Sequence, residues 1–234
     1  MRIIKLILMI LIINGCSKDS VSVNFNIEGA SNAVIVRIDG EHTVPWDTVK
    51  IINNELKLDL PLDSTLKTFY YFIFDSGASL RIGIEPGDKL IGSADASGSL
   101  TDYKITGSKL SEQLLALYQP VLESSRVIDS LDEYRKLSNE PDSNYIQIET
   151  RHYKFLENRY YSHKKEILKV MEMDSSNLSN VFGFFQKVAA APLFSSKEED
   201  HIFFQEFGDV IIKKHPNHPL ARIFILERKR MLGQ

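Results

Sequence analysis

YKITGSKLSEQLLALY (residues 103–118) contains the change of pattern that decides the fold. Before Gly107, apolar and polar residues alternate, which is typical of a β-strand with one buried face. After Ser108, apolar residues recur at steps of three and four, which predicts one face of an amphipathic helix. These apolar positions are Leu110, Leu114, Leu117, Tyr118, Val121 and Leu122. We therefore expect an α+β protein, with a β domain at residues 21–107 and a helical domain at residues 108–234.

Upstream of this stretch, the alternation begins at Val21 and continues through Val23, Phe25 and Ile27. Further strands are expected at residues 34–38, 49–51, 56–62, 69–74, 80–84, 90–91 and 103–105. The two strands around Asn53-Asn54 predict a hairpin, because asparagine tolerates the left-handed conformation of a tight turn. Short strands separated by turns indicate an antiparallel β-sandwich or a barrel-like sheet.

Downstream, the first helix or pair of helices should end at the polar stretch 138–142. A seven-residue repeat then predicts a hairpin of long helices. Its members are Ile146, Tyr153, Leu156, Tyr160, Ile167 and Val170, with Glu149 and His163 at equivalent positions. Three shorter helical segments should follow, at about residues 176–190, 197–214 and 218–231, because prolines mark their limits.

The N-terminus has the layout of a secretory signal, with a basic start followed by an apolar run at residues 6–13. The run is too short to span a bilayer, which takes about 20 apolar residues. Ile13, Gly15 and Cys16 resemble the lipobox of bacterial lipoproteins, which implies cleavage before Cys16 and acylation of its thiol. We therefore expect a signal peptide at residues 1–15 and a tether at residues 16–20. The alternative is an ordinary signal peptide in which the cysteine is incidental.

Several acyl chains on Cys16 would anchor the protein stably, whereas a single chain binds membranes only marginally. Ser17, rather than aspartate, follows the cysteine, and in the sorting rule of Gram-negative lipoproteins this favours the outer membrane. Lys18-Asp19 resembles the short signal that sends some lipoproteins to the cell surface. The expected location is therefore the cell envelope, on either the periplasmic or the outer face.

Composition excludes several classes of function. Removing residues 1–15 takes Arg2 and Lys5 from the 28 basic residues, which leaves 26 against 31 acidic ones and a net charge of −5. Nucleic acid is therefore not an expected partner. Cys16 is the only cysteine, and its acylation would leave no thiol for a disulfide, a zinc site or redox exchange. We expect no cofactor.

The order of strands and helices, with a set of turn sequences, resembles the N-terminal region of TlpA-like, AhpC/TSA-type thiol-disulfide lipoproteins of Bacteroidetes-type bacteria. The turn sequences are Asp47-Thr48-Val49 with Asn53-Asn54, Ile84-Glu85-Pro86-Gly87-Asp88, Ile105-Thr106-Gly107-Ser108-Lys109 and Lys214-His215-Pro216-Asn217-His218-Pro219. The resemblance covers nearly the whole mature chain. In that family a thioredoxin domain with a Cys-x-x-Cys pair follows, and no residue here corresponds to that pair.

The preferred functional hypothesis is therefore a non-enzymatic accessory lipoprotein. It would bind an envelope protein or peptide, or serve as a spacer or homodimerisation module. The first alternative is the non-catalytic half of a thiol-disulfide oxidoreductase, separated from its thioredoxin domain. The second is an enzyme that uses only carboxylates, for which the sequence offers no paired-acid motif.

Candidate binding residues each have a structural alternative. His215 and His218 could ligate a metal, although a plain helix-to-helix turn fits their prolines better. His163 could titrate near neutral pH and loosen the helix pair, or could be a hydrogen-bonded structural residue. Glu149 is expected to be solvated near a helix end. Glu198-Glu199-Asp200 should favour a helix N-terminus rather than bind calcium.

The aromatic residues could likewise serve either in binding or in the structure. The helical domain is rich in phenylalanine: Phe182, Phe184, Phe185, Phe194, Phe203, Phe204, Phe207 and Phe224. They could line a groove for a peptide or lipid, but their helical spacing favours a bundle core. Adjacent pairs such as Phe184-Phe185 cannot both face inward, so one member should contact a neighbouring domain. Trp46 and Tyr70-Tyr71 could mark a ligand-binding face of the sheet or could simply cover it.

Overall fold

The computed structural model describes residues 20–40, 42–62, 67–98, 102–137, 145–195 and 198–233. The predicted signal peptide (residues 1–15), Cys16 and the tether up to residue 19 lie outside these residues, as does the polar stretch 138–142. Within the described ranges, none of the helices combines the length and the apolar character that a membrane span requires.

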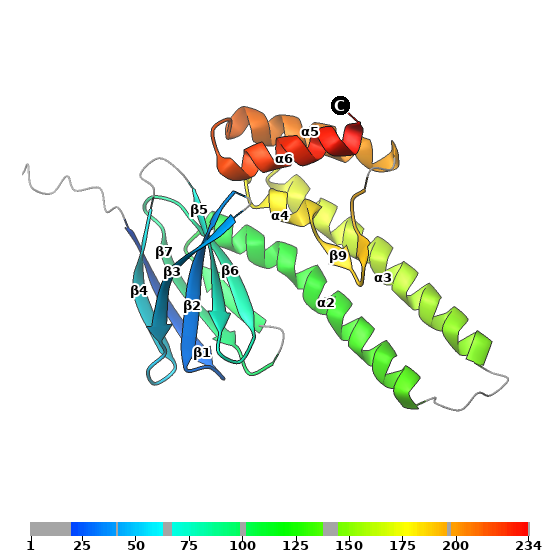
Figure 1. Cartoon of the computed structure of the whole chain (residues 1–234), viewed down its shortest axis with the longest axis horizontal. Helices are drawn as coiled ribbons and strands as arrows, with labels where there is room; N and C mark the ends of the chain where they lie inside the picture. The colour runs from blue at the N-terminus through cyan, green and yellow to red at the C-terminus, as the bar shows by residue number, and fades with distance from the viewer. Residues whose placement is uncertain are drawn as a thin grey trace, which may run out of the picture.

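The β domain is a sandwich of two four-stranded sheets (Figure 1). One sheet contains, in spatial order, β4 (Glu55–Pro61), β1 (Ser20–Glu28), β7 (Lys89–Asp95) and β8 (Asp102–Thr106). The other contains β3 (His42–Lys50), β2 (Asn32–Asp39), β5 (Thr68–Phe74) and β6 (Ser79–Ile84). The inward-facing residues of both sheets form one apolar core, which includes Phe25, Ile35, Phe72 and Leu90. The expected α+β class is confirmed.

The pairing is antiparallel except between β1 and β7, which run parallel. The expectation of a wholly antiparallel domain is therefore wrong for this pair. A tight turn cannot join parallel neighbours, because they need a crossover connection. Here the chain passes through the opposite sheet between β1 and β7, so periodicity alone could not reveal the pairing.

The turn at Asn53-Asn54 forms as predicted, with φ values of 53° and 62° and a bridge between Ile52 and Glu55. The strands on either side do not form the expected hairpin, because β3 and β4 belong to different sheets. Most of β3 was also not expected, since it is exposed along nearly its whole length. It tolerates Pro45 because it is an edge strand, where a missing N–H breaks no interior ladder.

The helical domain begins with two long helices, α2 (Lys109–Leu137) and α3 (Tyr145–Met173), which lie side by side and project from the body (Figure 1). The predicted helix hairpin is thus present. After it come α4 (Asn180–Phe184), the short strands β9 (Lys187–Val188) and β10 (Ala191–Pro192), α5 (Glu198–Lys214) and α6 (Pro219–Leu232). The helix expected at residues 176–190 is wrong beyond α4, because a small antiparallel ladder replaces it.

The predicted repeat on α3 is correct only in its second half. Ile167 is buried, whereas Ile146 and Tyr153 are 76% and 71% exposed. A strict seven-residue repeat drifts by about 20° per heptad on a straight helix. Over two or three heptads this drift turns the repeat away from α2, and His152 takes the buried position instead.

The phenylalanines form the core of the helical domain, as their spacing favoured. The ring of Phe184 lies 4.8–5.9 Å from four other buried rings, those of Phe194, Phe204, Phe207 and Phe224. Phe185 is exposed, so the expectation that adjacent phenylalanines face different ways is confirmed. The contact with the β domain comes from Phe182 instead, whose ring centroid lies 5.1 Å from that of Phe69.

The first turn of α2 is attached to the edge strand β6 at Gly83. The Ser111 hydroxyl donates to the Gly83 carbonyl (2.6 Å) and accepts from the Gly83 N–H (3.1 Å), and the Ser108 hydroxyl donates to the same carbonyl (2.8 Å). These hydroxyls take the place of a neighbouring strand, because an edge strand otherwise leaves its peptide groups unpaired. A Cβ at residue 83 would lie 2.7 Å from the Phe69 ring and 2.8 Å from Leu110 Cβ, so only glycine permits this approach.

We expect Ser111→Ala to lower the free energy of unfolding by about 1–3 kcal/mol, because it leaves the buried N–H of Gly83 without an acceptor. The control is Ser79→Ala, at the exposed start of the same strand, which should change it by about 0.5 kcal/mol or less. Urea unfolding followed by the fluorescence of Trp46, the only tryptophan, measures both. Equal effects of the two substitutions would contradict a specific role for Ser111.

Candidate functional site

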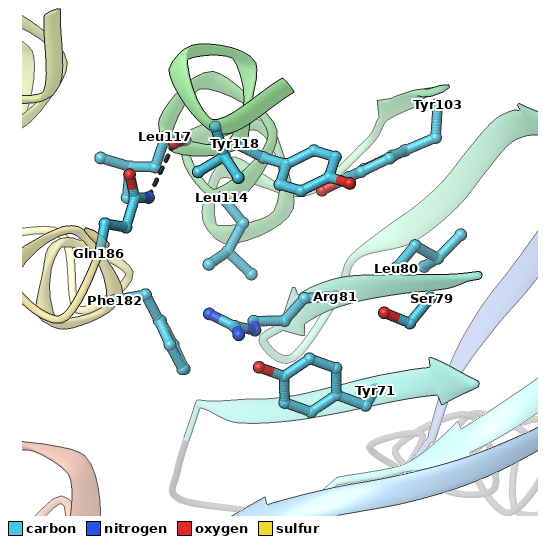
Figure 2. Close-up of a pocket in the computed structure, with 11 residues that line it drawn as sticks. Tyr71, Ser79, Leu80, Arg81, Tyr103, Leu114, Leu117, Tyr118, Phe182 and Gln186 are labelled. Carbon is cyan, nitrogen blue, oxygen red and sulfur yellow. Dashed lines mark hydrogen bonds between the residues drawn. The ribbon is translucent and has the colours of Figure 1, made fainter. Parts of the chain in front are cut away.

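A cavity of about 190 Å³ lies where the β domain meets the helices (Figure 2). Side chains from β5, β6 and β8 form one wall, and α2 with the α4 segment forms the other. The principal lining residues are Tyr71, Arg81, Tyr103, Leu114, Tyr118 and Phe182.

Arg81 is placed in this cavity by the strand pattern of β6. Its neighbours Leu80 and Ile82 face the sandwich core, so Arg81 faces the opposite side of the sheet, where the helices cover it. Tyr71 on β5 is its direct cross-strand partner. Directly opposed residues project from the same face of a sheet, which brings the phenol ring against the guanidinium.

The guanidinium lies between two aromatic rings, with its Cζ 4.4 Å from the ring centroid of Tyr71 and 4.3 Å from that of Phe182 (Figure 2). Its Nε is enclosed and has no hydrogen-bond partner among the described residues. Burial lowers the pKa of Arg81 to about 10, and no carboxylate is among the groups that oppose this shift. At neutral pH the cavity therefore holds a positive charge that no acidic side chain balances.

Tyr103 and Tyr118 close the cavity on the side away from Phe182, with ring centroids 5.5 Å apart. Burial raises the pKa of Tyr103 above its usual value, so its phenol is neutral at physiological pH. The lining thus combines aromatic and aliphatic surface with one cation. Such a site can bind an anionic group by charge-assisted hydrogen bonds and can pack the apolar part of the same ligand against its rings.

A chain of buried hydrogen bonds holds the helical wall in place. Gln186 Nε2 donates to the Leu117 carbonyl (2.8 Å; Figure 2), and its Oε1 accepts from His163 Nε2 (2.8 Å). His163 Nδ1 therefore accepts from the Ser124 hydroxyl (2.7 Å), which in turn accepts from Arg159 Nε (2.8 Å). Burial lowers the pKa of His163 and keeps its imidazole neutral. Of the two alternatives for His163, the hydrogen-bonded structural residue fits this arrangement.

His215 and His218 form the helix-to-helix turn that their prolines favoured. His215 Nε2 donates to the Ser176 carbonyl (2.9 Å), and His218 Nε2 donates to the Lys67 carbonyl (2.7 Å). His218 Nδ1 also accepts from the Leu220 N–H (3.1 Å) and so caps α6. In the described part of the chain, no three His, Cys, Asp or Glu side chains are grouped closely enough to hold a metal. The metal hypothesis therefore gains no support.

Most of the other candidate residues are structural. Tyr70 is buried and donates from its hydroxyl to the Pro61 carbonyl (2.7 Å), and Trp46 packs edge-on against its ring at 6.3 Å. Asp200, in the first turn of α5, accepts from the Ser195 N–H (2.9 Å) and pairs with Lys164 of α3. Glu149 is half-buried near the start of α3, so the expectation of a solvated side chain is wrong.

Of the aromatic candidates in the sheet, which are Trp46, Tyr70 and Tyr71, only Tyr71 lines the cavity. Arg81 was not among the predicted site residues. In sequence, Arg81 occupies an outward position of an alternating strand, and such a position normally faces water. The signal that could have revealed it is its neighbour two residues on, Gly83. A glycine on the same face permits close approach of another element, which would bury the arginine.

Comparison with protein-family models, with curated proteins and with solved structures finds no match for this chain. The resemblance to the N-terminal region of TlpA-like lipoproteins therefore stays a prediction from the sequence.

Three histidines whose pKa values are lowered in the folded state predict that the protein loses stability in acid. Burial lowers the pKa values of His163, His215 and His218, so the folded state keeps them neutral while the unfolded chain takes up protons near pH 6.5. The contribution of these histidines to the free energy of unfolding is therefore fully present above about pH 6.5. Below that pH the free energy of unfolding falls by about 1.4 kcal/mol per pH unit for each proton that only the unfolded state binds. Urea unfolding at pH 7.5 and 5.5 measures the loss.

The variant His218→Asn isolates one of these groups. Asparagine retains a side-chain oxygen that can cap α6 but does not titrate, so the loss between pH 7.5 and 5.5 should become smaller. His42→Asn, on the exposed edge strand β3, is the matched control and should leave the loss unchanged. An undiminished loss in His218→Asn would show that this histidine does not carry the pH dependence.

Proposed function

We propose that this chain is a lipid-anchored binding protein of the bacterial cell envelope, which holds a carboxylate-bearing ligand in the Arg81 cavity and does not catalyse a reaction on it. The observation that carries the proposal is the half-buried guanidinium of Arg81, whose Nε is enclosed without a hydrogen-bond partner and which has no acidic partner among the described residues. Removing a charged group from water is costly unless it is paired. An anionic ligand would supply the missing partner.

The geometry favours a carboxylate joined to an apolar group. Arginine presents several N–H donors in a fixed plane and can bind both oxygens of a carboxylate. The rings of Tyr71 and Phe182 lie against the guanidinium, with centroids 4.4 and 4.3 Å from its Cζ, so a ligand oxygen would reach the N–H groups on the part that these rings leave uncovered. Leu114 and Tyr118 then offer apolar surface to the remainder of the ligand.

The cavity is smaller than the 300–1,000 Å³ of typical sites for drug-sized molecules. It suits the end of a larger molecule, such as the C-terminal residue of a partner peptide or an acidic side chain. This accords with the hypothesis of an envelope protein or peptide partner. The expected acylation of Cys16 supports the location, because β1 begins at Ser20 and only a short segment separates the body from the anchor.

The ligand class can be tested with N-acetyl-leucine and its uncharged amide, which have the same shape. We expect N-acetyl-leucine to raise the thermal midpoint of the protein and the amide to leave it unchanged, because only the carboxylate pairs with Arg81. The variant Arg81→Gln should abolish the response, whereas Arg37→Gln, at an exposed position of β2, should keep it. A wild-type protein that does not respond, or that responds equally to both compounds, would overturn the proposal.

The anchor is tested separately with Cys16→Ser, expressed in a Gram-negative host. We expect the wild type to incorporate labelled palmitate and to sediment with membranes, and the serine variant to do neither, because serine offers no thiol to acylate. Ser17→Ala is the control and should behave as the wild type in labelling. Palmitate incorporation by Cys16→Ser would show that Cys16 is not the acylated residue.

A further inference from the structure

A second cavity, of about 560 Å³, lies between α2 and α3. Its lining residues belong to the outer half of the helix hairpin, and this hairpin projects from the body (Figure 1). Its apolar walls come from Val127, Leu131, Tyr134, Ile148 and Phe155. Its volume is within the range of sites that bind small molecules and far exceeds the space of a single water. It shares no lining residue with the Arg81 cavity.

His152 is the unusual group in this cavity. Its side chain is only 6% exposed, yet neither ring nitrogen has a hydrogen-bond partner among the described residues. Its ring packs edge-on against Tyr134, with centroids 5.5 Å apart. Buried polar groups are almost always hydrogen-bonded, and a neutral imidazole offers one donor and one acceptor. An occupant of the cavity with a polar group would satisfy the histidine.

The charged residues around the cavity indicate the sign of that polar group. Arg126 and Arg151 line it together with a single acid, Glu123. The ion pairs of Arg126 are long, at 3.9 Å to Glu123 and 4.0 Å to Asp102, so its guanidinium is only weakly neutralised. The cavity therefore combines apolar walls, an unpaired N–H donor and an excess of positive charge.

We infer that this cavity binds a medium-chain fatty carboxylate. The hydrocarbon chain lies along Val127, Leu131 and Phe155, and the carboxylate accepts from the His152 imidazole and faces Arg151. A carboxylate satisfies the donor of His152 and the local charge together, whereas a neutral alcohol satisfies only the imidazole. The inference is independent of the proposed function, because the two cavities use different residues.

The test uses the full chain carrying Cys16→Ser and calorimetric titration with laurate, below the concentration at which it forms micelles. We expect one laurate to bind per chain and dodecanol to bind at least tenfold more weakly. His152→Leu, which keeps the apolar wall but removes the donor, should weaken laurate binding by about 10- to 100-fold, as expected for a hydrogen bond to a charged group. His42→Leu is the control at an exposed position and should bind as the parent does.

Arg151→Gln gives a second variant at an exposed position, where substitution should not disturb folding. It should weaken the binding of laurate but not of dodecanol. Arg81→Gln should leave laurate binding unchanged, so failure of this inference is distinguishable from failure of the proposed function. Absence of laurate binding, or equal binding by parent, His152→Leu and Arg151→Gln, would overturn the inference. A dimer in sedimentation velocity that His152→Leu dissociates would also overturn it, because a second copy of the chain would then occupy the cavity.

Discussion

The attachment of α2 to Gly83 is the constraint on which the rest of the structure depends. Ser108 and Ser111 satisfy the outer peptide groups of an edge strand, so a helix takes the place that another strand could occupy. Two residues back along the same face of β6, the side chain of Arg81 needs more room than a glycine. Because α2 is held close at Gly83 and slopes away from the sheet (Figure 1), a space remains over Arg81 that the two elements do not fill.

The buried charge then depends on how firmly the helical wall is held. Phe182 covers one face of the Arg81 guanidinium, and it lies in the segment that Gln186 ties to α2. Gln186 is itself oriented by His163, whose neutral form is required because its Nδ1 accepts from Ser124. His163, which the sequence analysis considered as a pH-dependent group, thus holds Gln186 in position behind the cavity wall. Fully satisfied buried networks of this kind give a site rigidity, which lowers the cost of ordering it around a ligand.

The sequence predicted the elements well where one face of each is buried and the other is solvated. The alternation in β1 and the helical repeat in α2 are both correct, because burial on one side imposes a regular period. The errors lie where that condition fails: β3 is exposed along nearly its whole length, and residues 176–190 pack on several sides at once. Periodicity alone did not identify Arg81 as a site residue, because it occupies an outward position of its strand and the helix that covers it lies about thirty residues further along the chain.

Pro120 lies in the middle of α2, near the junction between the residues that line the first cavity and those that line the second. Proline lacks the N–H that would bond the Ala116 carbonyl, and it disturbs the helix over the preceding turn. Close to the proline, the carbonyls of Leu117 and Pro120 accept from Gln186 Nε2 and Arg159 Nη2, and these bonds hold α2 to its neighbours. On the N-terminal side of Pro120, Leu115 and Tyr118 pack against the core of the β domain. Since the net charge of the chain is −3, small free anions are not attracted to it from a distance. In the two proposed sites, a ligand that gains from burying apolar surface as well as from pairing with an arginine is therefore favoured over a simple anion.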